Sequence, residues 1–202
     1  MDAPLLTFDD GPSESTKEIL DLLRPYGIRA TFFLIGFRAD QRPDLVKLIA
    51  DDGHVIGNHT WDHVPLADTL NNAEAAGDVQ RGIEVVKLKL QQANDGLATI
   101  LGAAPSPFRG PYLNVNDCVL DIAQTLGLAH LDVDVDTCDY DDRYDAEYVA
   151  NAILGAQPDQ IVLLHDGNGD ERGGDINPPR PKTVEALRRA LPAFAERWQL
   201  PD

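Results

Sequence analysis

Short apolar runs alternate with amphipathic stretches along nearly the whole of this 202-residue chain. The apolar runs have the length of strands, whereas the amphipathic stretches repeat apolar residues at steps of three and four, which is the helical period. Strands that alternate with helices predict parallel strands with helices outside, hence an α/β fold. The expected strands are residues 5–8, 31–35, 54–58, 131–136 and 161–164.

Start and stop residues place the expected helices between these strands. Ser15 and Glu18 have the spacing of a capping box, and Gly27 ends the apolar pattern that follows. A long helix is predicted over about residues 73–93, where we interpret the apolar stripe as core packing. The other expected helices begin at Pro43 and Asn116, surround residues 148–153, and cover 184–198 with a kink at Pro192. Residues 166–181 are expected to form a loop.

Length and charge limit the classes of function. The chain fits one domain over residues 1–202, and 43% hydrophobic residues can build a core. Lys and Arg number 17 against 34 Asp and Glu, which leaves a net charge of −17. A surface this acidic repels phosphate groups. Nucleic acid and anionic membranes are therefore poor partners. Solubility alone also explains the charge, and we give that interpretation more weight.

The sequence shows no targeting signal that would set the localisation of the protein. No stretch is long and apolar enough to span a membrane, and the first residues lack the regions of a signal peptide. The chain is then cytoplasmic if complete, or secreted or in the cell envelope if a leader has been removed. Cys118 and Cys138 do not make a disulfide framework, so we treat both as structural. We expect a monomer.

Ionisable side chains follow four of the expected strands, at the point where each strand ends. They are Asp9 and Asp10, His59 and His63, Asp136 and Asp139, and His165. In a (β/α) barrel the carboxyl ends of the strands share one face, where active sites lie. Turn chemistry alone does not account for four such strand ends, so we expect a site there.

Two histidines and a neighbouring carboxylate suggest a metal site. His59 and His63 lie four residues apart, and both can face one ion if the segment is helical or turns tightly. With one carboxylate they complete a three-ligand site that keeps a position open for water. The alternative is a chance histidine pair beside a capped Asp-Asp turn. From an extended backbone Asp9 and Asp10 point different ways, and which of them would bind the metal stays open.

Arg109 and His165 are candidates for catalysis. Arg109 lies in a proline-rich segment and keeps its charge at all relevant pH values. It either orients a carboxylate or is an ordinary surface arginine, with even weight. His165 ends an apolar strand, and Asp136 or Asp139 could favour its protonated form, as a general acid requires. The alternative is a histidine at the core edge bonded to backbone.

Five segments, in order along the chain, resemble the motifs of the polysaccharide deacetylases, the NodB homology domain of carbohydrate esterase family four. The segments are Thr7-Phe8-Asp9-Asp10-Gly11-Pro12, His59-Thr60-Trp61-Asp62-His63, Arg109-Gly110-Pro111-Tyr112, Asp136-Thr137-Cys138-Asp139-Tyr140 and Leu163-Leu164-His165. The resemblance implies a distorted (β/α) barrel, usually of seven strands. It also implies metal-dependent removal of N-acetyl groups from a carbohydrate that contains GlcNAc, such as chitin oligomers or peptidoglycan.

The resemblance further implies a role for each matched residue. Asp10, His59 and His63 would bind a divalent metal, usually Zn²⁺, with Co²⁺ or Ni²⁺ as alternatives. Asp9 would be the general base, oriented by Arg109, and the backbone N–H of Tyr112 would bind the oxyanion. His165 would be the general acid with Asp139 as its partner. Candidates for substrate binding are Trp61, Tyr140 and Leu163, although Tyr140 replaces the usual Trp.

Other functions remain compatible with the same motifs. An O-acetyl esterase acting on acetylxylan would use the same residues, and so would a hydrolase of small cyclic amides. A glycan-binding relative without catalysis is a further alternative, although the intact set of ionisable residues argues against it.

Overall fold

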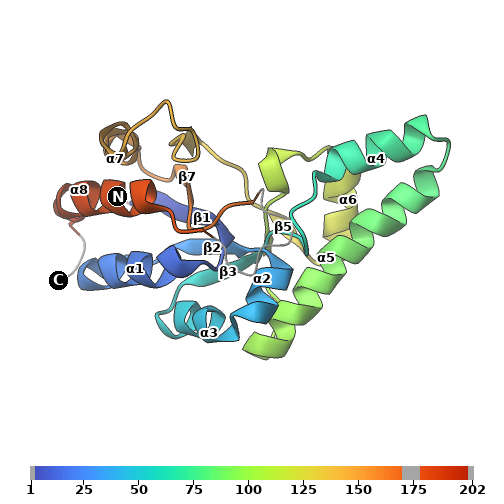
Figure 1. Ribbon diagram of the computed structural model, residues 1–202, viewed down its shortest axis with the longest axis horizontal. Helices are drawn as coiled ribbons and strands as arrows, with labels where there is room; N and C mark the ends of the chain where they lie inside the picture. Colours follow the sequence, from blue (N-terminus) through green and yellow to red (C-terminus); the bar gives the residue numbers. More distant parts are fainter. Residues whose placement is uncertain (1–2, 170–177, 200–202) are drawn as a thin grey trace.

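The computed structural model describes residues 3–169 and 178–199, in which seven parallel strands form one sheet (Figure 1). The strand order is β5-β4-β3-β2-β1-β7-β6, so the sheet ends at β5 and β6. It curls into a half-barrel with helices outside, which confirms the predicted α/β distorted barrel. The strands are β1 Leu5–Gly11, β2 Thr31–Leu34, β3 Val55–Asn58, β4 Pro107–Phe108, β5 Ala129–His130, β6 Val135–Asp136 and β7 Ile161–His165.

The helices fall into two groups on the outside of the sheet (Figure 1). They are α1 Glu14–Leu23, α2 Gly36–Gln41, α3 Pro43–Asp51, α4 Leu66–Ala75, α5 Val79–Leu101, α6 Asp117–Thr125, α7 Ala146–Gly155 and α8 Pro181–Trp198, with 3₁₀ turns η1 Arg24–Tyr26 and η2 Pro111–Leu113. Helix α8 packs against α1 and α7, whereas α5 packs against α4 and α6. In the part of the chain that the structure describes, no helix could cross a membrane.

Two hydrophobic clusters match these two groups of helices. In the larger cluster, apolar residues of β1, β2 and β7 meet α1, α3, α7 and α8, and the rings of Phe8 and Phe32 stack with centroids 4.9 Å apart. The smaller cluster joins Phe108 of β4 to α4, α5 and α6. Burial of these side chains provides the main driving force for the fold.

The long helix predicted over residues 73–93 is in fact two helices. Gly77 adopts a left-handed backbone, with φ of 75°, and ends α4. Asp78 then caps α5 by accepting a hydrogen bond from the N–H of Arg81. Because α5 starts anew, Val79 is 47% exposed, and the buried stripe begins at Gly82.

Two further predictions differ from the structure. The strand expected over residues 131–136 is limited to Val135–Asp136, since the carbonyls of Leu131 and Asp132 accept hydrogen bonds from Arg109 instead of joining a ladder. Helix α8 begins at Pro181 and continues through Pro192, whereas the kink there stays a prediction. Of the loop predicted over residues 166–181, residues 170–177 lie outside the described residues. The short helix α2 has no side-chain cap and gave no sequence signal, whereas α4, also uncapped, begins at Leu66, ahead of the helix start predicted at residue 73.

The predicted capping box at Ser15 and Glu18 is wrong, because the box lies two residues earlier. Ser13 accepts a hydrogen bond from the N–H of Ser15, and Thr16 accepts one from the N–H of Ser13 at 2.8 Å. The Ser13 hydroxyl also donates to the carbonyl oxygen of Asp166, just beyond β7. Ser13 therefore joins the start of α1 to the strand end that carries His165.

We predict that Ser13→Ala lowers the free energy of unfolding by about 1–2 kcal/mol, because α1 loses its cap and a buried hydroxyl loses its bond. Glu18 is on the surface and pairs with Arg188, so Glu18→Ala should cost less than about 0.5 kcal/mol. Urea denaturation of the two variants measures the difference. Equal losses, or a larger loss for Glu18→Ala, would contradict the placement of the cap.

Candidate functional site

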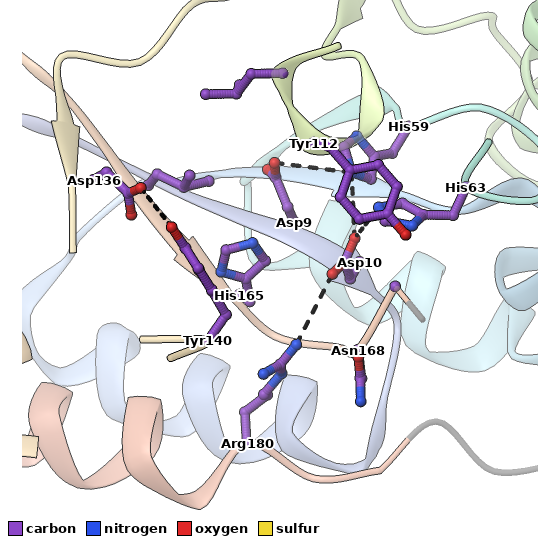
Figure 2. Close-up of a pocket in the computed structure, with 13 residues that line it drawn as sticks. Asp9, Asp10, His59, His63, Tyr112, Asp136, Tyr140, His165, Asn168 and Arg180 are labelled. Carbon is purple, nitrogen blue, oxygen red and sulfur yellow. Dashed lines mark hydrogen bonds and ion pairs between the residues drawn. The ribbon is translucent and has the colours of Figure 1, made fainter. Parts of the chain in front are cut away.

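The strand ends surround a pocket of about 420 Å³ (Figure 2). Side chains from β1, β6 and β7, and from the segments that follow β3 and β4, face it, as the sequence predicts for the carboxyl ends of parallel strands. The described residues that line it are Asp9, Asp10, His59, His63, Tyr112, Leu113, Asp136, Tyr140, Leu163, His165, Asn168, Gly169 and Arg180.

Asp9 and Asp10 both face the pocket because β1 is irregular at this point. In a regular strand, adjacent side chains point to opposite faces. Here the pairing of β1 with β2 shifts between Asp9 and Gly11, and Asp10 takes a left-handed backbone with φ of 73°. This bulge brings both carboxylates to the pocket while aiming them at different partners.

Asp10 lies against the two histidines. Its Oδ1 is 3.2 Å from His59 Nε2 and 2.9 Å from His63 Nε2, and all three side chains are buried. The segment from 59 to 63 is a tight turn, in which Thr60 Oγ1 accepts a hydrogen bond from the N–H of His63 at 3.0 Å. One nitrogen or oxygen from each residue therefore lies within 4.8 Å of the other two, a spacing at which all three could bind one metal ion.

The hydrogen bonds around the triad fit a divalent metal. His59 Nδ1 is 2.8 Å from the carbonyl oxygen of Arg109, which can only accept, so Nδ1 donates there and Nε2 is the nitrogen that faces Asp10 and would bind a metal once it is deprotonated. His63 Nδ1 is buried without a hydrogen-bond partner among the described residues. Two imidazoles and one carboxylate form a donor set typical of catalytic zinc.

Charge and space also favour ligation. Burial opposes ionisation of Asp10, but hydrogen bonds to His59 and His63 outweigh it and hold the pKa of Asp10 well below its usual value. A Cβ at position 169 would lie 2.4 Å from His63 Nδ1, so Gly169 leaves the room that the His63 ring occupies. The ligand carboxylate is thus ionised and one imidazole is held in place by its neighbours.

Arg109 is fully buried and holds Asp9. Its Nη1 donates to Asp9 Oδ1 and to Thr7 Oγ1, each at 2.8 Å, and its other nitrogens donate to the carbonyls of Leu131 and Asp132. The guanidinium also lies 4.4 Å from the centre of the Phe33 ring. The alternative of an ordinary surface arginine is therefore wrong.

His165 is paired with Asp139. Asp139 Oδ1 is 2.6 Å from His165 Nδ1, and Asp139 Oδ2 accepts a hydrogen bond from the backbone N–H of His165. Burial lowers the pKa of His165, but the attraction and hydrogen bond of Asp139 outweigh it and raise the pKa to about 9. Asp136, the other candidate partner, accepts a hydrogen bond from the Tyr140 hydroxyl at 2.9 Å instead.

The candidate substrate-binding residues have different positions. Tyr140 is 49% exposed, and its ring meets the His165 ring edge-on at 5.4 Å, while Leu163 lies in the pocket wall. Tyr112, 57% exposed, lies against the His63 ring at 4.6 Å. Trp61 is not among the described residues that line the pocket; its ring packs closely against Gly36, where a Cβ would lie 2.7 Å from it, and contacts the helix at Gly96.

Sequence reasoning missed several residues around the pocket. Arg180 lines it, with Nη2 4.0 Å from Asp10 Oδ2, and Leu113, Asn168 and Gly169 complete the wall. Asp166 is buried behind it, accepts a hydrogen bond from Thr16 at 2.5 Å, and has its pKa raised to about 7, mainly by burial. Leu113 and Asp166 directly follow Tyr112 and His165 in the sequence and could have been identified from that position, whereas nothing in the sequence singles out Arg180.

We predict that His165 of the metal-free protein stays protonated until the pH passes about 9. Because this pKa lies above the ordinary 6.5, the pair adds stability that is complete below pH 6.5 and lost as the pH rises through 9. Asp139→Asn should lower the pKa by at least about one unit. NMR titration of the His165 ring measures both, and Tyr140→Phe is the control. A wild-type value near 6.5 would contradict the pairing.

Comparison with known proteins agrees with this site. The family model described as polysaccharide deacetylase matches residues 2–131. A chitooligosaccharide deacetylase of Azorhizobium caulinodans is 33% identical over 95% of this chain and 88% of its own. A peptidoglycan-N-acetylglucosamine deacetylase of Bacillus cereus is 34% identical over 94% of this chain, which spans 66% of that protein.

A solved structure has the same fold. The family 4 acetyl xylan esterase of Clostridium thermocellum, solved with a cobalt ion, superposes with a TM-score of 0.76 and 27% identity, over 96% of this chain and 84% of that one. The chain belongs to the polysaccharide deacetylase family. It is accordingly a hydrolase whose relatives are deacetylases of chitin-type and peptidoglycan substrates.

Proposed function

We propose that this protein removes N-acetyl groups from a glycan that contains GlcNAc, either chitin oligomers or peptidoglycan. One observation carries the proposal: a buried Asp-His-His triad shares a pocket with an arginine-bound aspartate and an aspartate-bound histidine. Amide hydrolysis needs an electrophilic centre, a base and an acid. The triad would hold the electrophilic metal, the arginine-bound aspartate would be the base, and the aspartate-bound histidine would be the acid. The names of the two deacetylase relatives support the same substrate class.

Asp10, His59 and His63 would hold a divalent metal. Zn²⁺ is the first choice for this donor set, and Co²⁺ or Ni²⁺ are alternatives. When bound there, such an ion polarises the acetyl carbonyl and activates water.

Asp9 acts as the general base. Its Oδ1 is held by Arg109 at 2.8 Å, while its Oδ2 lies 3.9 Å from His59 Nε2, beside the triad. The arginine leaves Asp9 Oδ2 directed at the pocket, where it can take the proton of the attacking water. A base that is held in one orientation loses little entropy in reaching the geometry needed to take a proton from water.

Tyr112 and His165 complete the reaction. The backbone N–H of Tyr112 donates to the oxyanion, and one such donor contributes about 3–4 kcal/mol to the barrier reduction. His165, whose pKa is raised because the attraction and hydrogen bond of Asp139 outweigh its burial, then gives its proton to the leaving amine. An amine leaves poorly without a proton, so a histidine held in its charged form suits an amide more than an ester.

O-acetyl hydrolysis of acetylxylan is the second candidate, because the Clostridium thermocellum structure shares the fold and carries that activity in its name. Acetate release from chitin oligomers, peptidoglycan and acetylxylan, each with and without chelator, decides between them. We expect release from at least one GlcNAc-containing glycan, and loss of that release with chelator. Release from acetylxylan alone would favour the esterase. Glycan binding without any release would indicate a non-catalytic relative, and full activity after metal removal would exclude the metal site.

We predict that the two adjacent aspartates separate in their effects. Asp10→Asn removes a ligand charge, so bound metal should fall at least about tenfold. Asp9→Asn should keep the metal but lose about 100-fold or more in kcat, since the base is gone. Metal content by elemental analysis and acetate release on the same preparations measure the two effects. Equal metal loss in both variants would show that the roles are wrongly divided.

A further inference from the structure

The Asp139 carboxylate receives hydrogen bonds from two elements. Two come from His165, through Nδ1 at 2.6 Å and the backbone N–H at 2.8 Å. The third comes from the hydroxyl of Thr183, at 2.6 Å from Asp139 Oδ2. Thr183 is fully buried and belongs to the first turn of α8, far from Asp139 in sequence.

The hydrogen bond from Thr183 differs from the other two because it anchors the Asp139 side chain to a separate element, α8. Bonds between Asp139 and His165 fix the two residues to each other, but they do not fix the Asp139 side chain to a third point. The Thr183 hydroxyl ties Asp139 Oδ2 to α8, which is packed against α1 and α7. A buried carboxylate that loses one donor also loses part of the compensation for leaving water.

The segment that carries Asp139 is tied to α8 a second time, by a contact that does not involve the carboxylate. Lys182 Nζ donates to the carbonyl oxygen of Asp141 at 2.7 Å. Loosening of the segment and loss of the Asp139 hydrogen bond can therefore be separated by substitution at two adjacent positions.

We infer that Thr183 is a positioning residue for the acid, whose hydroxyl holds Asp139 so that the His165 ring keeps the orientation needed to protonate the leaving group. The inference rests on the proposed role of His165. Thr183 is not among the described residues that line the pocket, so it acts through Asp139 and not on the substrate.

The test compares Thr183→Val, which keeps the shape and removes the donor, with Thr183→Ser, which keeps the donor. With the chitin pentamer as substrate and Zn²⁺ bound, we expect Thr183→Val to lower kcat about 10- to 100-fold, with KM within about twofold of wild type. Thr183→Ser should recover kcat to within about threefold. In the metal-free protein, the NMR signal of the His165 Nδ1 proton should be lost to exchange with water in Thr183→Val and kept in Thr183→Ser.

Lys182→Met is the matched control, because it frees the segment but keeps the hydroxyl, and its kcat should stay within about threefold of wild type. Thr183→Ala replaces the valine variant if the latter does not fold. An unchanged kcat and Nδ1 proton signal in the donor-less variant would overturn the inference, and so would equal losses in Thr183→Val and Thr183→Ser. Absence of acetate release by the wild type would refute the proposed function, whereas the NMR comparison would still judge the role of Thr183.

Discussion

The buried ion pair between Arg109 and Asp9 is the interaction on which the site depends. Taking two charges out of water costs several kcal/mol for each ion, and this cost is offset only if their remaining donors and acceptors are satisfied. Thr7 and the carbonyls of Leu131 and Asp132 provide those partners for Arg109. One guanidinium thus constrains where β1 lies relative to the segment just beyond β5.

Backbone strain collects around the same pocket. Left-handed φ values occur at Asp10, Thr60, His63, Tyr112 and, close by, Cys138. Such conformations cost about 1–3 kcal/mol each and persist only where the surrounding structure holds them. At Asp10 the strain has a clear effect. A regular strand would direct only one of two adjacent carboxylates into the pocket, whereas the left-handed backbone at Asp10 directs a second one there. The site is therefore built by departures from regular structure at the ends of regular strands.

This explains which features the sequence could predict. The positions of Asp9, His59 and His165 could be predicted because each follows an apolar run with the length of a strand. The hydrophobic pattern of the sequence is enough to locate the ends of such runs. From the residues alone Asp139 and Asp136 could not be told apart, because the choice depends on the path of the segment after β6, and only the resemblance to the family motif named Asp139. Sequence reasoning places the cap of α1 at Ser15 because a second capping pattern lies two residues after the true cap, Ser13. It misses the break at Gly77 because the apolar stripe continues on both sides of that single left-handed residue.

The half-barrel ends at β5 and β6, and these two strands do not pair with each other. Arg109 follows β4 and reaches from β1 to the carbonyls just beyond β5, so the residue that orients the proposed base also joins the central strand to the segment at the open side. Arg109 therefore has a proposed role in catalysis and a role in stabilising the fold. Selection for activity would also preserve the contacts that Arg109 makes with the fold. Loss of activity in an Arg109 variant could for this reason not be assigned to catalysis alone.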